Sequence, residues 1–201
     1  MPVLTDKARA TRERILEAAE HQFHRHGYHA TGLDRIIADA GVTKGNFYYH
    51  FKSKEALAVA SLQRHFDRFG AELASRFGPD MSPLETVRGI LDYFVELVTA
   101  QKLDGGVVGC YFGNFSLEMG AGHAAVRDRL QTVFATVRGR FEYLLQRAAD
   151  SGDLPLGRDP KQIAAIIVSL LEGSILIDKA SQEPREVARA VEFLKGYLDG
   201  G

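Results

Sequence analysis

Residues 31–57 read TGLDRIIADAGVTKGNFYYHFKSKEAL and are the most informative stretch of this 201-residue sequence. The apolar residues of LDRIIADA recur at helical spacing, and Gly41 directly after them permits a sharp turn. Thr43 can cap a second helix, and Phe47 and Phe51, four residues apart, supply its buried face. This order predicts a helix-turn-helix motif, for which the spacing alone leaves a plain helical hairpin as the alternative.

The outer side of the second predicted helix carries groups that suit DNA. Lys44, Gly45 and Asn46 lie at the start of that helix. Lysine can donate to guanine, asparagine can bond adenine at two points, and glycine places no side chain between the backbone and the groove. Tyr49 and His50 can donate to phosphates, as can a lysine at the start of the following helix. This composition favours DNA recognition over an ordinary solvated face, which would carry more Glu and Lys.

The same stretch resembles the TetR family of bacterial transcriptional regulators. The resemblance rests on Thr31, the turn at 40–42, the run KGNFYYHF at 44–51 and the residues KSKE at 52–55. It implies an all-α, two-domain homodimer whose second motif helix enters the major groove, with the first three residues of the run near bases. Gly32 departs from the family pattern, because many relatives carry a second threonine there. The expected DNA-contacting residues are Thr31, Thr43, Lys44, Gly45, Asn46, Tyr48, Tyr49, His50 and Lys54.

The whole chain predicts helices, about nine of them, with no alternating strand pattern. The segments SPLE at 82–85 and DPKQ at 159–162 mark helix starts by a capping side chain and a proline in the first turn. We expect an all-α protein with a helix-turn-helix DNA-binding domain over residues 1–52 and a larger effector-binding and dimerisation domain over residues 53–201. The formal net charge is only −1, yet residues up to Lys54 carry nine Lys/Arg against six Asp/Glu, which indicates a local basic surface.

The C-terminal part contains two predicted helices with apolar faces. The segment from Ile163 to Ile177 is apolar over more of its circumference than one core-facing stripe requires, and residues 187–198 present a second apolar face. Two such helices from each of two chains would close a four-helix bundle and give a homodimer through the last two helices. A helix buried centrally within one chain is the alternative. A dimer would also present two reading helices to a palindromic site.

Aromatic residues at helical spacing in the larger domain could line a cavity, although most such residues form core. Cys110 follows a glycine-rich segment at an expected helix start, where the helix dipole lowers the pKa of a thiol and raises its reactivity. Gly109-Cys110, Glu118 and the sequence around residues 62–66 resemble the electrophile- and oxidant-responsive subgroup of the TetR family, in which Lys179 would supply a nearby positive charge. A small packing residue is the alternative for this cysteine. The expected effector or sensor residues are Cys110, Tyr111, Asn114, Phe115, Glu118, Phe66, Phe69, Tyr93, Phe94, Phe141 and Lys179.

Other kinds of site fit the sequence less well. Of the four histidines between positions 21 and 29, only His21 and His24 share a helical face, and no Cys or second carboxylate completes a tetrahedral set of ligands. We therefore expect no metal and no cofactor. The Gly105-Gly106 loop lacks the ending of a phosphate-binding loop and indicates a flexible connection. Cys110 and His123 have no recognisable third partner for thiol catalysis. A single cysteine, a charged N-terminus and no apolar run near bilayer length predict a cytoplasmic protein without a membrane span.

We therefore expect a sequence-specific DNA-binding transcriptional repressor, not an enzyme, that a small-molecule or electrophile effector releases from a palindromic double-stranded DNA operator. The effector would shift the helix that begins near residue 54 and change the separation of the two reading heads. A non-inducible DNA-binding module and a small thiol-dependent helical enzyme are the alternatives. The first would ignore every small molecule, and the second would turn over a substrate without DNA.

Overall fold

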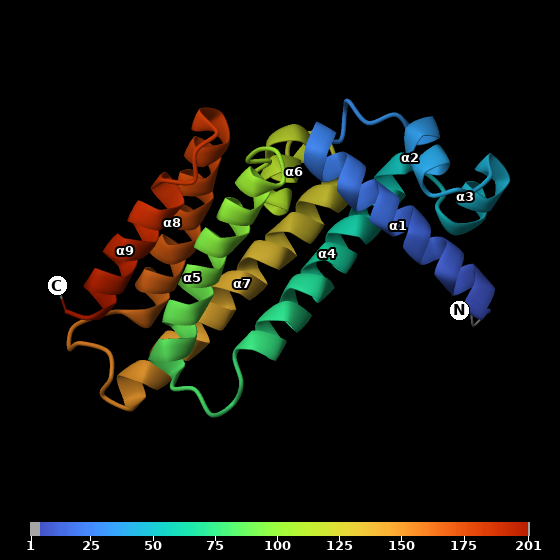
Figure 1. Ribbon diagram of the computed structural model, residues 1–201. Coiled ribbons are helices and arrows are strands. Elements are labelled where there is room, and N and C mark those ends of the chain that lie inside the picture. Colours follow the sequence, from blue (N-terminus) through green and yellow to red (C-terminus); the bar gives the residue numbers. More distant parts are fainter. Residues whose placement is uncertain (1–4, 201) are drawn as a thin grey trace. The chain divides into compact units, whose positions relative to one another are not determined.

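The computed structural model describes residues 5–200 and contains nine α-helices and no strand within that range (Figure 1). The all-α expectation and the number of helices are thereby confirmed. The helices are α1 Asp6–His26, α2 Leu33–Asp39, α3 Lys44–His50, α4 Lys54–Arg76, α5 Pro83–Leu103, α6 Tyr111–Met119, α7 Ala124–Asp150, α8 Pro160–Ser181 and α9 Glu186–Leu198. None of these described helices is long and apolar enough to cross a membrane.

Side-chain caps define the starts of α5 and α8, as the sequence predicts. The Ser82 hydroxyl accepts from the Glu85 amide at 3.3 Å, while the Glu85 carboxylate accepts from the Ser82 amide at 3.0 Å. A proline follows the cap within the first turn of both helices. Asp159 caps α8 by accepting from the Lys161 amide at 3.0 Å. Each cap satisfies amide groups that have no partner within their own helix.

The N-terminus of α9 is capped by a residue of another helix. Its own N-cap residue, Arg185, makes no side-chain cap bond. Instead the fully buried carboxylate of Asp178 on α8 accepts from the backbone amides of Arg185 at 3.1 Å, Glu186 at 2.7 Å and Val187 at 2.9 Å. A buried carboxylate that receives three amide hydrogens at a helix N-terminus is both bonded and stabilised by the helix dipole. Asp178 therefore fixes the turn between α8 and α9.

The chain forms two compact units, and each has its own core. The first comprises residues up to 69 together with 114–131, and the second comprises residues 70–113 and 132 onward. Helices α4, α6 and α7 each contribute residues to both units. The functional boundary after residue 52 stays a prediction. The largest fully buried side chains of the first unit are Phe23, Phe47, Ile15, Leu16, Ile36, Leu57, Leu62 and Met119.

The second unit is built mainly from α5, the C-terminal part of α7, α8 and α9, with the end of α4 and the start of α6. In it α8 and α9 lie side by side, and α9 also packs against α5 (Figure 1). Burial of one apolar face of each helix removes that surface from water and supplies the main stabilising free energy. The centre of this core is formed by Leu91, Val98, Phe141, Leu145, Ile163, Ile167, Val187 and Leu194.

Candidate functional site

The predicted helix-turn-helix lies in the first unit and consists of α2, a four-residue turn and α3. Gly41 has φ 61°, a left-handed conformation that glycine adopts without a Cβ penalty. The Thr43 hydroxyl caps α3 by accepting from the Asn46 amide at 3.2 Å. Phe47 is fully buried and Phe51 is 4% exposed, with 5.9 Å between their ring centroids. This anchoring fixes which side of α3 faces outward.

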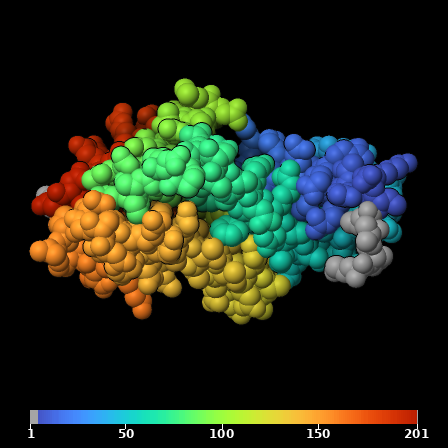
Figure 2. Space-filling model, turned by 90° about the horizontal axis from the view of Figure 1, so that it is seen from below, coloured from blue at the N-terminus to red at the C-terminus, as the bar shows by residue number. Residues whose placement is uncertain are grey.

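The outward side of α3 carries most of the predicted DNA-contacting residues. Lys44, Gly45 and Asn46 are exposed in its first turn, and the rings of Tyr48 and Tyr49 are 44% and 67% exposed. The Lys44 ammonium donates to the Asp34 carboxylate of α2 at 3.2 Å. Figure 2 shows atoms of this unit at the surface, with the blue atoms of α1 beside cyan atoms of the residues that follow it. These α3 side chains can donate to base edges and phosphates, and none of them is buried in the protein core.

His50 and Arg12 extend this surface toward α1. Burial lowers the pKa of His50, and the nearby Arg12 charge lowers it further, so the imidazole is neutral at neutral pH. The Arg12 guanidinium lies over the Phe51 ring, 5.1 Å from its centroid. Sequence reasoning did not include Arg12, although the cluster of basic residues in the first predicted helix was the available signal. An arginine held beside the end of α3 is suited to a phosphate contact.

Thr31 and Lys54 are engaged inside the protein. Thr31 is 1% exposed, and its hydroxyl lies 2.6 Å from the Gly27 carbonyl and 3.2 Å from the Gln22 carbonyl. The Lys54 ammonium donates to the Tyr28 carbonyl at 2.5 Å and lies 4.1 Å from the centroid of the Tyr28 ring. Burial lowers the pKa of Lys54, while Glu118 opposes that shift. For both residues the geometry shows a structural role and leaves the expected phosphate contact as a prediction.

The expected effector residues divide between the two units. Phe66, Phe69, Asn114, Phe115 and Glu118 belong to the first unit. There the Phe115 ring packs edge-on against Phe23, with 5.6 Å between centroids. The Glu118 carboxylate accepts from the backbone amides of Tyr28 at 3.1 Å and His29 at 2.9 Å. These two residues thus hold the α1–α2 connection.

The remaining six expected effector residues lie in the second unit and are Cys110, Tyr111, Tyr93, Phe94, Phe141 and Lys179. Tyr93, Tyr111 and Phe141 are buried, and Phe94 and Cys110 pack against the apolar core. The Arg76 guanidinium lies 4.4 Å from the centroid of the Tyr93 ring. Tyr93 and Phe141 therefore pack in the apolar core, as most aromatic residues at helical spacing do.

Cys110 precedes the first turn of α6, as expected, but its surroundings differ from the expectation. The Gly113 amide lies 3.5 Å from the Cys110 sulfur, which is the position of a helix cap. Although part of the residue is exposed, burial of the thiol raises its pKa well above the ordinary value, and the charge of Glu172 raises it further. The backbone amides at the start of α6 lower the pKa of the thiol, but burial and Glu172 outweigh them. The expected lowering of this thiol pKa is therefore wrong in this conformation, because burial and, after it, the charge of Glu172 outweigh the effect of the helix terminus.

Glu172 is itself perturbed by its position on α8. Burial raises the pKa of this carboxyl group, and only the contact with Cys110 opposes that shift. Its Oε2 atom would lie 2.5 Å from a Cβ added to Gly113, so the carboxyl group lies directly against the first turn of α6. The signal that could have identified it is a single acid closing a nine-residue apolar run. Cys110 and Glu172 thus form a pair in which both groups favour their protonated forms.

Four histidines between positions 21 and 29 raise the question of a metal site. Within residues 5–200, no three His, Cys, Asp or Glu side chains are arranged so that they could hold a metal.

The loop before Cys110 is held by side chains from two other segments. Gln101 and Gln182 bond its backbone from Val107 to Gly109. The expected flexibility of the Gly105-Gly106 connection stays a prediction.

Comparisons with known proteins agree with this architecture. Residues 15–61 match the family model for bacterial regulatory proteins of the tetR family, and residues 83–194 match the tetracyclin repressor-like C-terminal domain. The transcriptional repressor DhaR of Mycobacterium sp. (strain GP1) is 29% identical over 184 residues, covering 90% of each chain. The repressor NemR of Escherichia coli K12 is 28% identical over 193 residues, covering 94% of each chain.

Solved structures give the same result for the fold. The crystal structure of the reduced form of Escherichia coli NemR superimposes with a TM-score of 0.82 at 25% identity, covering 92% of this chain and 95% of that one. A TetR regulator from Chloroflexus aurantiacus gives a TM-score of 0.85 at 25% identity, covering 96% of both chains. The first family model covers the helix-turn-helix, and the second covers the helices from α5 into α9. The chain belongs to the TetR family and is a DNA-binding transcriptional repressor.

Proposed function

We propose that this protein binds a palindromic operator as a homodimer and that an effector acting on the C-terminal domain releases it. The observation that carries the proposal is the exposed first turn of α3, held outward by two buried phenylalanines. Two such helices, one from each copy, would enter successive major grooves. Because α4, α6 and α7 contribute residues to both units, a shift of one of these helices acts in both. A differential affinity of about 1–3 kcal/mol between two conformations is enough for control.

The proposed dimer uses α8 and α9. Four large apolar side chains on these helices are exposed: Ile166 at 44%, Leu176 at 49%, Ile177 at 55% and Phe193 at 62%. Large exposed apolar groups on neighbouring helices favour a protein partner, and TetR-family regulators dimerise. A second copy of the same pair would close the four-helix bundle. Sedimentation of Phe193→Lys at micromolar concentration tests this face, because a variant that stays dimeric would contradict it.

Base reading is assigned to the first turn of α3, and phosphate binding to the residues around it. Asn46→Ala is expected to cost about 1–3 kcal/mol at one operator position and to relax base preference there. Lys52→Ala, an exposed lysine outside the helix, should weaken all sequences alike and lower the salt dependence. Fluorescence anisotropy with single-base operator variants measures both. An equal loss on every sequence for Asn46→Ala would contradict its base-reading role.

The effector is proposed to be a small molecule or an electrophile, with Cys110 as the candidate sensor. The partly exposed position of Cys110 at the start of α6 supports this, whereas its raised pKa keeps the free thiol protonated and slow to react. N-ethylmaleimide should therefore release operator DNA slowly from the wild type and not from Cys110→Ser. Release from Cys110→Ser at the same rate would assign the response to a non-covalent site.

The raised pKa of Cys110 also disfavours the alternative of an enzyme that uses this thiol as a nucleophile. We infer that the protein is a regulator. Because it acts on chromosomal DNA, we place it in the cytoplasm.

A further inference from the structure

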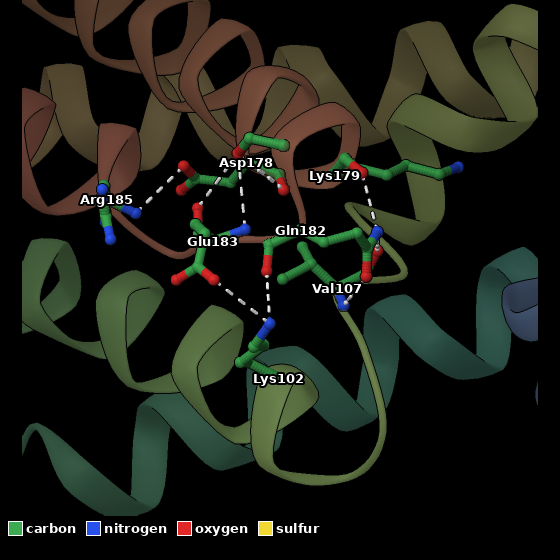
Figure 3. A network of polar contacts seen from close by, with 8 residues as sticks. Lys102, Val107, Asp178, Lys179, Gln182, Glu183 and Arg185 are labelled. Atoms are coloured by element: carbon green, nitrogen blue, oxygen red, sulfur yellow. Dashed lines mark hydrogen bonds and ion pairs between the residues drawn. The ribbon is translucent and has the colours of Figure 1, made fainter.

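The loop between α5 and α6 is held by two glutamine side chains. From α5, the Gln101 Oε1 accepts from the amides of Val108 at 3.0 Å and Gly109 at 2.9 Å, and its Nε2 donates to the Gly109 carbonyl at 3.1 Å. From the α8–α9 turn, the Gln182 Oε1 accepts from the Val107 amide, and its Nε2 donates to the Val107 carbonyl, both at 3.0 Å (Figure 3). Val107 and Gln182 are 75 residues apart in the sequence.

Gln182 occupies a backbone conformation that is unusual for its residue type. Its φ of 59° makes it the only non-glycine residue with positive φ between residues 5 and 200. Glycine or asparagine would adopt this left-handed conformation at lower cost. The longer glutamine amide instead reaches Val107 and also donates to the Lys179 carbonyl at 2.7 Å. Three hydrogen bonds from one side chain offset the backbone cost, and they require the length of glutamine.

The surrounding groups are shaped to receive this side chain. Gly106, with φ 140°, leaves space that a Cβ would fill only 2.9 Å from the Gln182 Oε1. The Lys102 ammonium donates to the Gln182 carbonyl at 2.7 Å, which satisfies the end of α8 (Figure 3). On the other side of the turn, Asp178 holds the start of α9. The backbone of the turn around Gln182 is thus held by Lys102 and Asp178, independently of the bonds that the Gln182 side chain makes to the loop.

We propose that Gln182 is a positioning residue that ties the α8–α9 turn to the loop before α6 and thereby controls access to Cys110. The bonded loop residues lead directly into Cys110, so the two glutamines restrain the backbone that immediately precedes the residue carrying the thiol. The regulatory consequence rests on the proposed function: an effector response at Cys110 is linked to α8 and α9, the helices assigned to the dimer. The link itself is a property of the second unit and does not depend on DNA.

Two variants remove the contact while keeping the backbone conformation. Gln182→Gly and Gln182→Asn both accept positive φ, but glycine has no amide, and the asparagine amide is one methylene too short to reach Val107. Gln146→Ala on the exposed face of α7 is the matched control, because that glutamine bonds only Asp150 in its own helix. Thermal unfolding of all three variants reports whether the fold is intact.

The first readout is the rate at which N-ethylmaleimide modifies the single cysteine of the 201-residue chain. Gln182→Gly and Gln182→Asn should react at least about tenfold faster than the wild type, a difference of about 1.4 kcal/mol in loop opening. Gln146→Ala should react at the wild-type rate. A change below twofold in both Gln182 variants would overturn the proposal, as would an equal acceleration in the control.

The second readout separates a local release from general destabilisation. Amide hydrogen exchange should rise at least about tenfold at Val107, whose donor loses its acceptor, and should also rise at Val108 and Gly109, because the freed loop opens more often. The amides of Ile167 and Leu171 in the middle of α8 should keep their wild-type protection. A parallel rise at these α8 amides would show global loosening and would overturn the positioning role. Neither readout uses an operator, so a failure to bind DNA would contradict the proposed function alone.

Discussion

Replacing Asp178 by asparagine tests how strongly one buried carboxylate fixes the turn between α8 and α9. Its Oδ1 accepts from the amides of Arg185 and Glu186, and its Oδ2 accepts from the Val187 amide at 2.9 Å. In Asp178→Asn one oxygen becomes an amide donor, which faces the Val187 N–H and leaves it without an acceptor. Loss of one charge-assisted bond, worth about 1.5–3 kcal/mol, and weakening of two others predict a total cost of about 2–4 kcal/mol.

The matched control is the same substitution at an exposed cap. Asp159 accepts from one amide at the start of α8, and asparagine caps helices about as well as aspartate, so Asp159→Asn should change stability by less than about 0.5 kcal/mol. Urea unfolding followed by circular dichroism, at one protein concentration because the proposed dimer contributes to stability, measures both variants. Equal losses for the two variants, or a loss below about 1 kcal/mol for Asp178→Asn, would refute the reasoning.

Three further predictions concern the first unit and a helix cap. Burial alone would raise the pKa of Glu20, but His65, Arg68 and Arg64 outweigh it, so the pKa lies below the ordinary 4.5. Its contribution to stability is then full above pH 4.5 and is lost as the pH falls through the lower folded pKa, so Glu20→Gln should flatten the acid side of the unfolding free energy; an unchanged slope would refute this. Phe47→Ala should cost about 3–5 kcal/mol and abolish operator binding, which unfolding and anisotropy measure together, whereas retained binding would contradict its anchoring role. Ser82→Ala should cost about 1 kcal/mol by melting, and no loss would contradict the capping role at α5.

Local features of the fold were predictable because their causes lie within a few residues. The cap by Thr43, the turn at Gly41 and the buried face from Phe47 to Phe51 are all set by spacing within one short segment. The proline and capping signals before α5 and α8 are equally local. Thr31, by contrast, bonds carbonyl groups of the preceding helix and turn, and no pattern within its own short segment specifies those partners.

The candidate sites needed information that spacing does not contain. Burial raises the pKa of Cys110, and Glu172, which α8 brings against the start of α6, raises it further; no local pattern specifies either effect. Lys54 donates to the Tyr28 carbonyl, although its place at a helix start suggested a phosphate contact. In each case the electrostatic surroundings come from residues distant in sequence, so only packing determines the sign of the effect.

The sequence by itself determined the helical class, the reading motif and the exposed first turn of its second helix, because periodicity and capping act over three or four residues. Only the tertiary structure decided which polar groups are free and which are bonded. Asp178 caps a helix other than its own, and Gln182 holds a loop 75 residues earlier in the chain. A buried polar group must find a partner wherever the fold supplies one, and that partner is set by the packing of helices rather than by their order.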